Sequence, residues 1–445
     1  MMILGMTLGH CTRYVAKPLP VLVDDAKWPT FKASVSQLEL PALKKVKLDA
    51  TQPWNMLTVA VLAVLHNPEL ESAAQAEQVA EAEAFSAGLL PDPQVQAGRE
   101  RAMGRSTQGY QYGLGFDTGV WLEHDSVHRA AEAHFNQIRL DRYWQQWQVI
   151  AAAEQAFVQQ VYAEQRLHSL ESFLNQLHQW ELYALQQEKQ GLLRDDQLHH
   201  LHMLKASMER LRQSAELASE QGQVTLHTLL GLDPGVPVRL SGFPEYYPEA
   251  IHEAQSHLER LSQIRPDLRA LQQGYKSQEE RVRQAVLAQF PSVGVMLTRS
   301  RDVYEPVNAL GLELQFSLPV LSGQQGVLAT QKASRAQLYK EYERRVRQAD
   351  FDVKALLQRL QILNRQLQQQ QTELQRQTRY RMEIESAMQR NDAGIESVVE
   401  ARNDEESMFL EREQTLRDRA VQTIALQLLT GSGVFAPEEH IVTHR

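Results

Sequence analysis

Two long stretches of the chain have the spacing of apolar and polar residues that is typical of α-helices. Glycine is absent from residues 120–190 and 327–393, and proline is absent from 94–233 and 320–436. Proline destabilises a helix interior by about 3 kcal/mol and glycine by about 1 kcal/mol. The two glycine-free stretches therefore predict two very long helices, each about 100 Å in length at a rise of about 1.5 Å per residue.

Each long helix is followed, after a single glycine, by more helical sequence. Gly191 and Gly394 end the two stretches, and the helical pattern resumes over 192–221 and 395–430. Leucines of the second stretch recur three, four and seven residues apart, as in a coiled-coil seam: Leu356, Leu360, Leu363, Leu367 and Leu374. We predict two long helical hairpins, with turns at glycines that have a positive φ or a close neighbour.

The pattern changes to strict alternation just before each long helix. Apolar residues take the even positions of 110–122 and 310–320, while 292–298 and, weakly, 94–100 also alternate. We therefore predict four strands, whose apolar face includes Tyr112, Leu114, Phe116, Leu312, Leu314 and Phe316. Such strands fit the wall of an outer-membrane barrel with lipid outside and water inside. A small soluble sheet with one buried face has the same alternation.

The two halves of the chain carry the same features about 200 residues apart. Pro93 corresponds to Pro291 at an offset of 198, and Gly191 to Gly394 at an offset of 203. A constant offset of this kind predicts an internal duplication. We divide the chain into a leader at 1–11, an extended segment at 12–50, repeats at 51–232 and 250–431, a crossover at 233–249 and a tail at 432–445.

Composition and motifs narrow the class of function. The chain has 445 residues, a net charge of −9 and one cysteine. The acidic balance argues against a nucleic-acid partner, and the lone cysteine excludes a disulfide framework and a thiolate zinc site. The longest apolar stretch, 56–65, has about half the length of a membrane-spanning helix. No nucleophile elbow, phosphate-binding loop or dinucleotide motif is present, so we predict no enzyme and no cofactor.

Three histidines next to the first predicted turn suggest a metal site. His199 and His202 share a helix face, and Asp195 and Asp196 lie one turn earlier. Histidines alone do not define a closed coordination set. We therefore favour a solvated helix and keep His199 and His202 as weak candidates for metal binding.

The N-terminus has features of a bacterial lipoprotein signal. An apolar run ends at Cys11, which would be the acylated residue and a lipid anchor. No Lys or Arg precedes Cys11, the apolar run is short, and His10 stands where Gly or Ala is usual. A start codon assigned too late explains the first two departures. The alternative is a free N-terminal cysteine.

Several short motifs, in their order, duplication and spacing, resemble the TolC-type outer-membrane efflux family. They are Asn67-Pro68-Glu69-Leu70, Ala87-Gly88-Leu89-Leu90-Pro91-Asp92-Pro93, Arg265-Pro266-Asp267-Leu268-Arg269-Ala270, Phe290-Pro291-Ser292-Val293 and Leu318-Pro319-Val320. The likeness extends from about Pro53 to Gly431. The segments at 89–93 and 319–326 look closest to the heavy-metal efflux branch of that family.

The resemblance implies a mainly α-helical fold with a small β-barrel part. In a homotrimer, each subunit would contribute four strands to one twelve-stranded membrane β-barrel, which the long helices would continue as a periplasmic α-helical coiled-coil barrel. The implied function is a passive exit channel of a tripartite efflux system in the bacterial outer membrane, with most of the chain in the periplasm. Its implied partners are a periplasmic adaptor and an inner-membrane pump.

The resemblance also implies roles for individual residues. Glu400 would contribute to a gate, because three copies around a threefold axis would form a ring of carboxylates at the closed tunnel end. Asn403 and Arg402 stand where the family usually has a second acid and a leucine; alternatively, Glu400 belongs to an ordinary solvated face. The residues that would contact the adaptor are Gln190, Gly191, Leu192, Ala393, Gly394 and Ile395.

A second class of function has to be weighed against the channel. A soluble periplasmic coiled-coil adaptor or scaffold would also contain long helical hairpins. Such an adaptor should carry one hairpin flanked by Gly- and Val-rich β domains. Two hairpins with little β sequence between them favour the channel.

Overall fold

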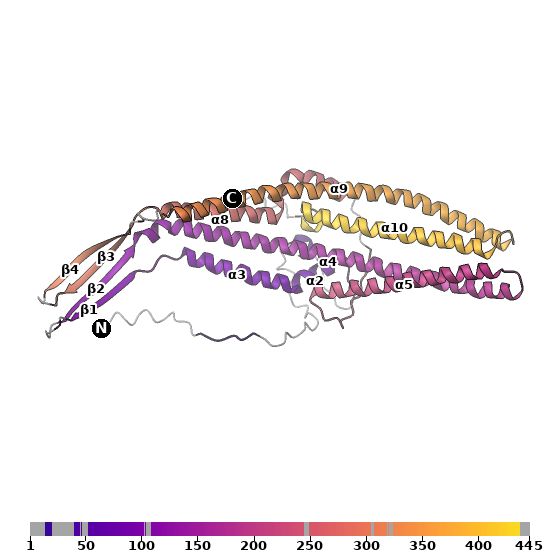
Figure 1. The fold of residues 1–445 in the computed structure, drawn as a ribbon, viewed down its shortest axis with the longest axis horizontal. Coiled ribbons are helices and arrows are strands. Elements are labelled where there is room, and N and C mark those ends of the chain that lie inside the picture. Colours follow the sequence, from indigo (N-terminus) through magenta and orange to yellow (C-terminus); the bar gives the residue numbers. More distant parts are fainter. Residues whose placement is uncertain are drawn as a thin grey trace.

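The strands lie at one end of a long, narrow molecule, and the turns of two helical hairpins lie at the other end (Figure 1). The computed structural model describes residues 14–19, 40–44, 46, 52–101, 103, 108–243, 249–303, 307–317, 319 and 324–436. Cys11, the leader at 1–11, most of the segment at 12–50, and residues 437–445 lie outside this set.

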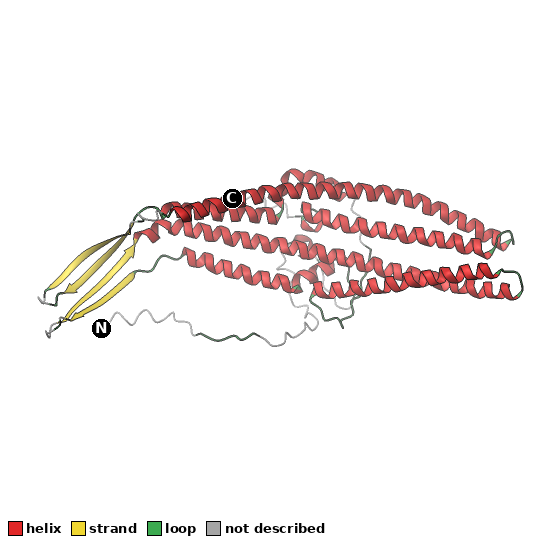
Figure 2. Cartoon of the chain, viewed as in Figure 1, coloured by secondary structure: helices red, strands yellow, loops and turns green. Residues whose placement is uncertain are grey.

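Helices make up most of the described chain (Figure 2). The first half contains α1 (Pro41–Lys44), α2 (Met56–His66), α3 (Pro68–Gly88), α4 (Thr118–Lys189) and α5 (Asp195–Leu230). The second half contains α6 (Glu249–His257), the 3-10 helix η3 (Leu258–Arg260), α7 (Leu261–Ile264), α8 (Pro266–Leu287), α9 (Gln325–Gln389), α10 (Ile395–Thr430) and the 3-10 helix η4 (Gly433–Phe435). The predicted long helices are thus confirmed, with 72 residues in α4 and 65 in α9.

The motifs with proline begin helices, as their sequence predicts. The side chain of Asn67 caps α3 by accepting hydrogen bonds from the backbone N–H groups of Glu69 and Leu70, and Pro68 takes the first helical turn. Proline suits this position because its missing N–H would have no partner inside the helix. At the start of α8 the guanidinium of the N-cap residue Arg265 binds Asp267 at 2.8 Å.

Four antiparallel strands form one sheet in the order β1-β2-β3-β4. They are β1 (Gln94–Arg101), β2 (Gln108–Asp117), β3 (Ser292–Arg301) and β4 (Asn308–Ser317). The prediction of a strand over 110–122 is wrong at the C-terminal end, because α4 begins at Thr118. The Asp117 carboxylate accepts a hydrogen bond from Gly119 N–H at 2.8 Å and caps the helix. The strand predicted over 310–320 instead covers Asn308–Ser317.

The two hairpin turns have the same backbone form, but only one of them places glycine where it was expected. Gly191 has φ +72°, which confirms the prediction for the first turn. In the second turn Asn391 takes the left-handed position, with φ +62°. Gly394 has φ −83° and no heavy atom within 4 Å of a Cβ built on it, so our expectation for Gly394 is wrong. The turns therefore correspond at an offset of 200, which pairs Gly191 with Asn391.

The buried core lies in separate clusters along the length of the molecule. The largest joins α2, α4 and α5 to residues near both chain ends, including Leu43 and Phe435. A second cluster joins α4, α5 and α10 near the turns, and a third joins α8 to α9 and α10. Leu360, Leu363 and Leu367 of the predicted seam are buried. None of the helices in the described ranges is both long enough and apolar enough to cross a membrane.

Candidate functional site

One face of the sheet is apolar and exposed. Directly paired residues of an antiparallel sheet lie on the same face, and the register aligns Val95, Leu114, Leu297 and Leu312 in one row across all four strands. The side chains predicted for this face are 45–67% exposed: Tyr112, Leu114, Phe116, Leu312, Leu314 and Phe316. Apolar groups in such numbers normally mark an interaction surface.

The apolar face has a limited length in the direction of the strands. Arg299 pairs with Tyr112 and Leu310, and Arg301 pairs with Tyr110, so charged side chains lie toward the end of the sheet remote from the helices. On β4 the apolar positions extend from Leu310 to Phe316, a distance of about 20 Å at about 3.4 Å per residue. This height is close to the apolar band of about 25 Å on outer-membrane barrels.

The opposite face of the sheet carries small and polar residues. Gln96, Gly113, Thr298 and Gly311 form the row next to the apolar one. A Cβ on Gly113 would meet the Met296 side chain at 2.7 Å. The Met296 side chain thus covers this part of the strand and would have to move to admit a larger residue.

The hairpin turns expose most of the residues that the sequence assigned to a partner. Gln190, Gly191 and Gly394 are exposed, and Leu192 is an apolar side chain with 70% of its surface exposed. Ile395 instead is 8% exposed and packs in the cluster that contains Val399 and Leu410. Ile395 therefore belongs to the interior of the protomer, and we omit it from the candidate contact surface.

The two hairpins are held together close to their turns. Gln197 of α5 donates a hydrogen bond to Glu396 of α10 at 3.0 Å. Arg402 of α10 donates to Gln176 of α4 at 2.6 Å and binds Glu385 of α9 at 2.5 Å. Sequence reasoning missed these links because the partners lie far apart in the chain.

Glu400 lies on α10 in the same region. Its side chain is exposed, whereas Val399 and Ala401 on either side are buried; Asn403 is half-buried. Residues two apart on a helix do not face each other, and the Arg402 guanidinium is bound by Glu385 and Gln176. Arg402 is therefore not available to neutralise Glu400 within one protomer.

Further along α10, burial perturbs the titration of one carboxyl group. Loss of solvent, reinforced by the neighbouring Glu405, raises the pKa of Glu406 to about 7. Glu405 itself binds Arg381 at 2.5 Å and accepts a hydrogen bond from Thr378. Polar and charged groups thus join α9 to α10 near the turn of the second hairpin.

The histidines near the first turn do not converge on a metal site. His199 and His202 are exposed. His202 Nε2 lies 3.2 Å from the Glu181 carboxylate, which also binds Lys205 at 2.5 Å. The hydrogen bond from Lys205 lowers the pKa of Glu181. Within the described ranges, no group of three or more His, Cys, Asp and Glu side chains is arranged to hold a metal ion.

The fold matches solved outer-membrane channels over nearly its whole length. CusC, whose structures concern transmembrane channel formation, aligns with a TM-score of 0.70 and 17% identity over 96% of this chain and 100% of its own. The outer-membrane channel OprN aligns with a TM-score of 0.73 and 14% identity over 89% and 96%. The CmeC outer membrane channel of Campylobacter jejuni aligns with a TM-score of 0.70 and 16% identity over 84% and 85%.

The comparisons establish the class of fold. The chain has the fold of the TolC-type outer-membrane efflux channels, as its sequence motifs predicted. The sequence matches no family model and no curated protein.

Proposed function

We propose that this protein is an outer-membrane exit channel of a tripartite efflux system, which conducts its substrates passively. The observation that carries this proposal is the sheet whose apolar face is exposed over about 20 Å, at the end of the molecule opposite the hairpin turns. An exposed apolar face of this kind is stable when it contacts lipid. The likeness in fold to CusC, OprN and CmeC supports the same function.

The sheet requires further strands for closure. In the described sheet β1 and β4 lie at the two edges and present unpaired backbone groups. A membrane offers no water to satisfy such groups, so the edges have to pair with other chains. We propose a homotrimer whose three sheets close one twelve-stranded barrel, with the apolar faces toward lipid and the Gly113 face toward the lumen.

We further propose that the hairpin turns face the periplasm and contact an adaptor, which connects the channel to an inner-membrane pump. Exposed Gln190, Gly191, Leu192 and Gly394, with half-buried Ala393, support this surface. The best probe is Leu192, because a 70% exposed leucine at a turn contributes little to folding. Leu192→Asp should reduce export and adaptor cross-linking while the trimer still assembles, whereas Leu192→Met should preserve both.

Acylation of Cys11 would add a second attachment to the outer membrane. Cys11→Ser should remove a lipid-dependent mass from the mature protein, and the barrel should still hold the protein in the membrane. An unchanged mass would exclude acylation but not the channel.

Membrane fractionation tests the central proposal. Expression in a bacterium should deliver the protein to the outer-membrane fraction, where chemical cross-linking should yield trimers. The soluble periplasmic adaptor or scaffold, which has a related helical architecture, makes the opposite prediction. Recovery only in the soluble periplasm would refute the channel.

A further inference from the structure

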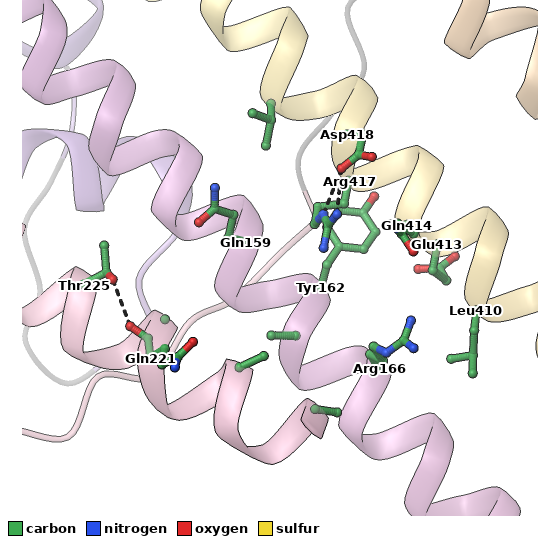
Figure 3. A pocket seen from close by; sticks show the side chains of 15 residues that line it. Gln159, Tyr162, Arg166, Gln221, Thr225, Leu410, Glu413, Gln414, Arg417 and Asp418 are labelled. Carbon is green, nitrogen blue, oxygen red and sulfur yellow. Dashed lines mark hydrogen bonds and ion pairs between the residues drawn. The ribbon is translucent and has the colours of Figure 1, made fainter. Parts of the chain in front are cut away.

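A cavity of about 510 Å³ lies between α4, α5 and α10, away from the sheet and from the hairpin turns (Figure 3). Its walls come from three stretches: 159–166 of α4, 215–225 of α5 and 410–421 of α10. Cavities of about 300–1,000 Å³ are typical sites for small molecules. The question is which chemistry this cavity fits.

The lining carries two guanidinium groups, Arg166 and Arg417, and two carboxylates, Glu413 and Asp418. One of these charged groups has no partner within the described chain. Arg417 binds Asp418 at 2.8 Å, and Glu413 lies 3.5 Å from Arg412. Arg166 is half-buried, and among the described residues it forms no hydrogen bond or ion pair. Burial and the nearby Arg417 lower the pKa of Arg166. A guanidinium that is partly removed from water and has no acceptor would gain from an added anion.

The remaining lining has both polar and apolar parts. In Figure 3 Tyr162 and Arg417 lie together, and Arg166 lies one helical turn further along α4, on the side of Glu413 and Leu410. The polar lining also includes Gln159, Gln221 and Gln414. The apolar part is made by Ala163, Ala215, Ala218, Leu410 and Val421. The cavity therefore places one unpaired guanidinium, that of Arg166, next to a weakly polar wall.

We propose that this cavity binds a small organic anion whose carboxylate or sulfonate pairs with Arg166 and whose apolar body packs against the alanines, Leu410 and Val421. The planar guanidinium can donate two parallel hydrogen bonds to such a group. The site is formed within one protomer and is independent of the proposed transport function.

Calorimetric titration of the purified full-length protein tests the site. The probe is 1-naphthoate, and its neutral analogue 1-naphthalenemethanol measures the apolar contribution alone. Naphthoate should bind at least about tenfold more tightly than the alcohol, and Arg166→Gln should weaken naphthoate binding at least about tenfold. The matched control is Arg210→Gln, since Arg210 is an exposed arginine of α5 outside the cavity. It should bind naphthoate like the unaltered protein.

A second variant acts through volume instead of charge. Ala218→Phe places a ring into the cavity from α5 and should abolish binding of both probes. Circular dichroism verifies that each variant folds. If Arg166→Gln does not fold, Ala218→Phe provides the test. The absence of saturable naphthoate binding, equal affinity for the two probes, or unchanged binding by either variant would overturn the proposal.

Discussion

Single residues decide where the helices of this protein end. Gly231 and Gly431 directly follow α5 and α10, Gly191 follows α4 after one further residue, and all three have positive φ angles of 60–72°. Asn391 takes the equivalent position after α9. Its short polar side chain is tolerated in this conformation better than most, which is why the two turns share one form without sharing a glycine.

The first prediction separates a required glycine from a dispensable one. Gly191→Ser should destabilise the protein by about 1–2 kcal/mol, because an L side chain is strained at positive φ. Gly394→Ser is the matched control: Gly394 is the N-cap of α10 in an extended conformation, where serine is favoured. Thermal unfolding of both variants measures the difference. Equal losses would contradict our interpretation of the second turn.

The second prediction concerns Glu154, a fully buried acid of α4 whose carboxyl oxygens have no hydrogen-bond partner within the described chain. Burial raises its pKa to about 8. The folded state therefore keeps a proton that the unfolded state loses above its ordinary value of 4.5. Between these two values the stability of the protein should fall as pH rises.

Glu154→Leu should stabilise the protein by about 1–3 kcal/mol, because it removes a buried polar group without a partner. The gain should be larger at pH 8 than at pH 5, since the ionised form is the more costly one. The unfolding midpoints at pH 5 and pH 8 measure this gain in stability. The control is Glu171→Leu, at an exposed position of the same helix. A gain that does not change with pH would show that Glu154 does not titrate in this range.

At the scale of elements, the sheet is defined by its two faces. Alternation along β2 and β4 predicted the apolar face, and the register aligns this face across all four strands. The strand boundary at Thr118 could not be read from alternation, because Val120 and Leu122 continue the pattern by chance after α4 has begun. The residue that marks the start of the helix is Asp117, whose side chain caps α4.

The third prediction follows from those faces. Leu314→Arg should sharply reduce the amount of trimer in the outer-membrane fraction, since an arginine on the lipid face of a barrel costs about 2–4 kcal/mol. Gln315→Arg places the same charge on the opposite face of the same strand and should assemble normally. This is a cleaner control than a change at Gly113, where Met296 restricts the space. If both arginines are equally harmful, the assignment of the two faces is wrong.

At the scale of the whole molecule, two hairpins and two pairs of strands form one elongated body (Figure 1). α4 packs against α3, α5, α8 and α10, and thus joins both halves of the chain. Near the turns, the bonds from Gln197 to Glu396 and from Arg402 to Gln176 fix one hairpin against the other. The exposed Glu400 lies in this joined region.

The fourth prediction belongs to the assembled trimer. Glu400→Gln should reduce the cation selectivity of single channels in a planar bilayer and weaken their block by multivalent cations, because a ring of carboxylates attracts cations. Asp404→Asn removes a charge one turn further along α10, at another exposed position. It should have a smaller effect. Unchanged selectivity in Glu400→Gln would exclude Glu400 from the gate.

The amino-acid sequence by itself determined the local structure of this protein. Helix lengths follow from the absence of proline and glycine, helix starts from X-Pro-acid motifs, and strand faces from alternation. Each depends on interactions within a few residues. Short motifs in a fixed order were also sufficient to predict the fold that the comparisons confirm.

Only the tertiary structure decided which distant groups meet. The pairing of β2 with β3 joins strands about 180 residues apart, and the burial of Glu154, the link from Arg402 to Gln176 and the cavity at Arg166 depend on how whole helices pack. No local pattern marks these residues, because a glutamate or an arginine on a helix is usually solvated. Their environment is set by neighbours that the chain brings together only when it folds.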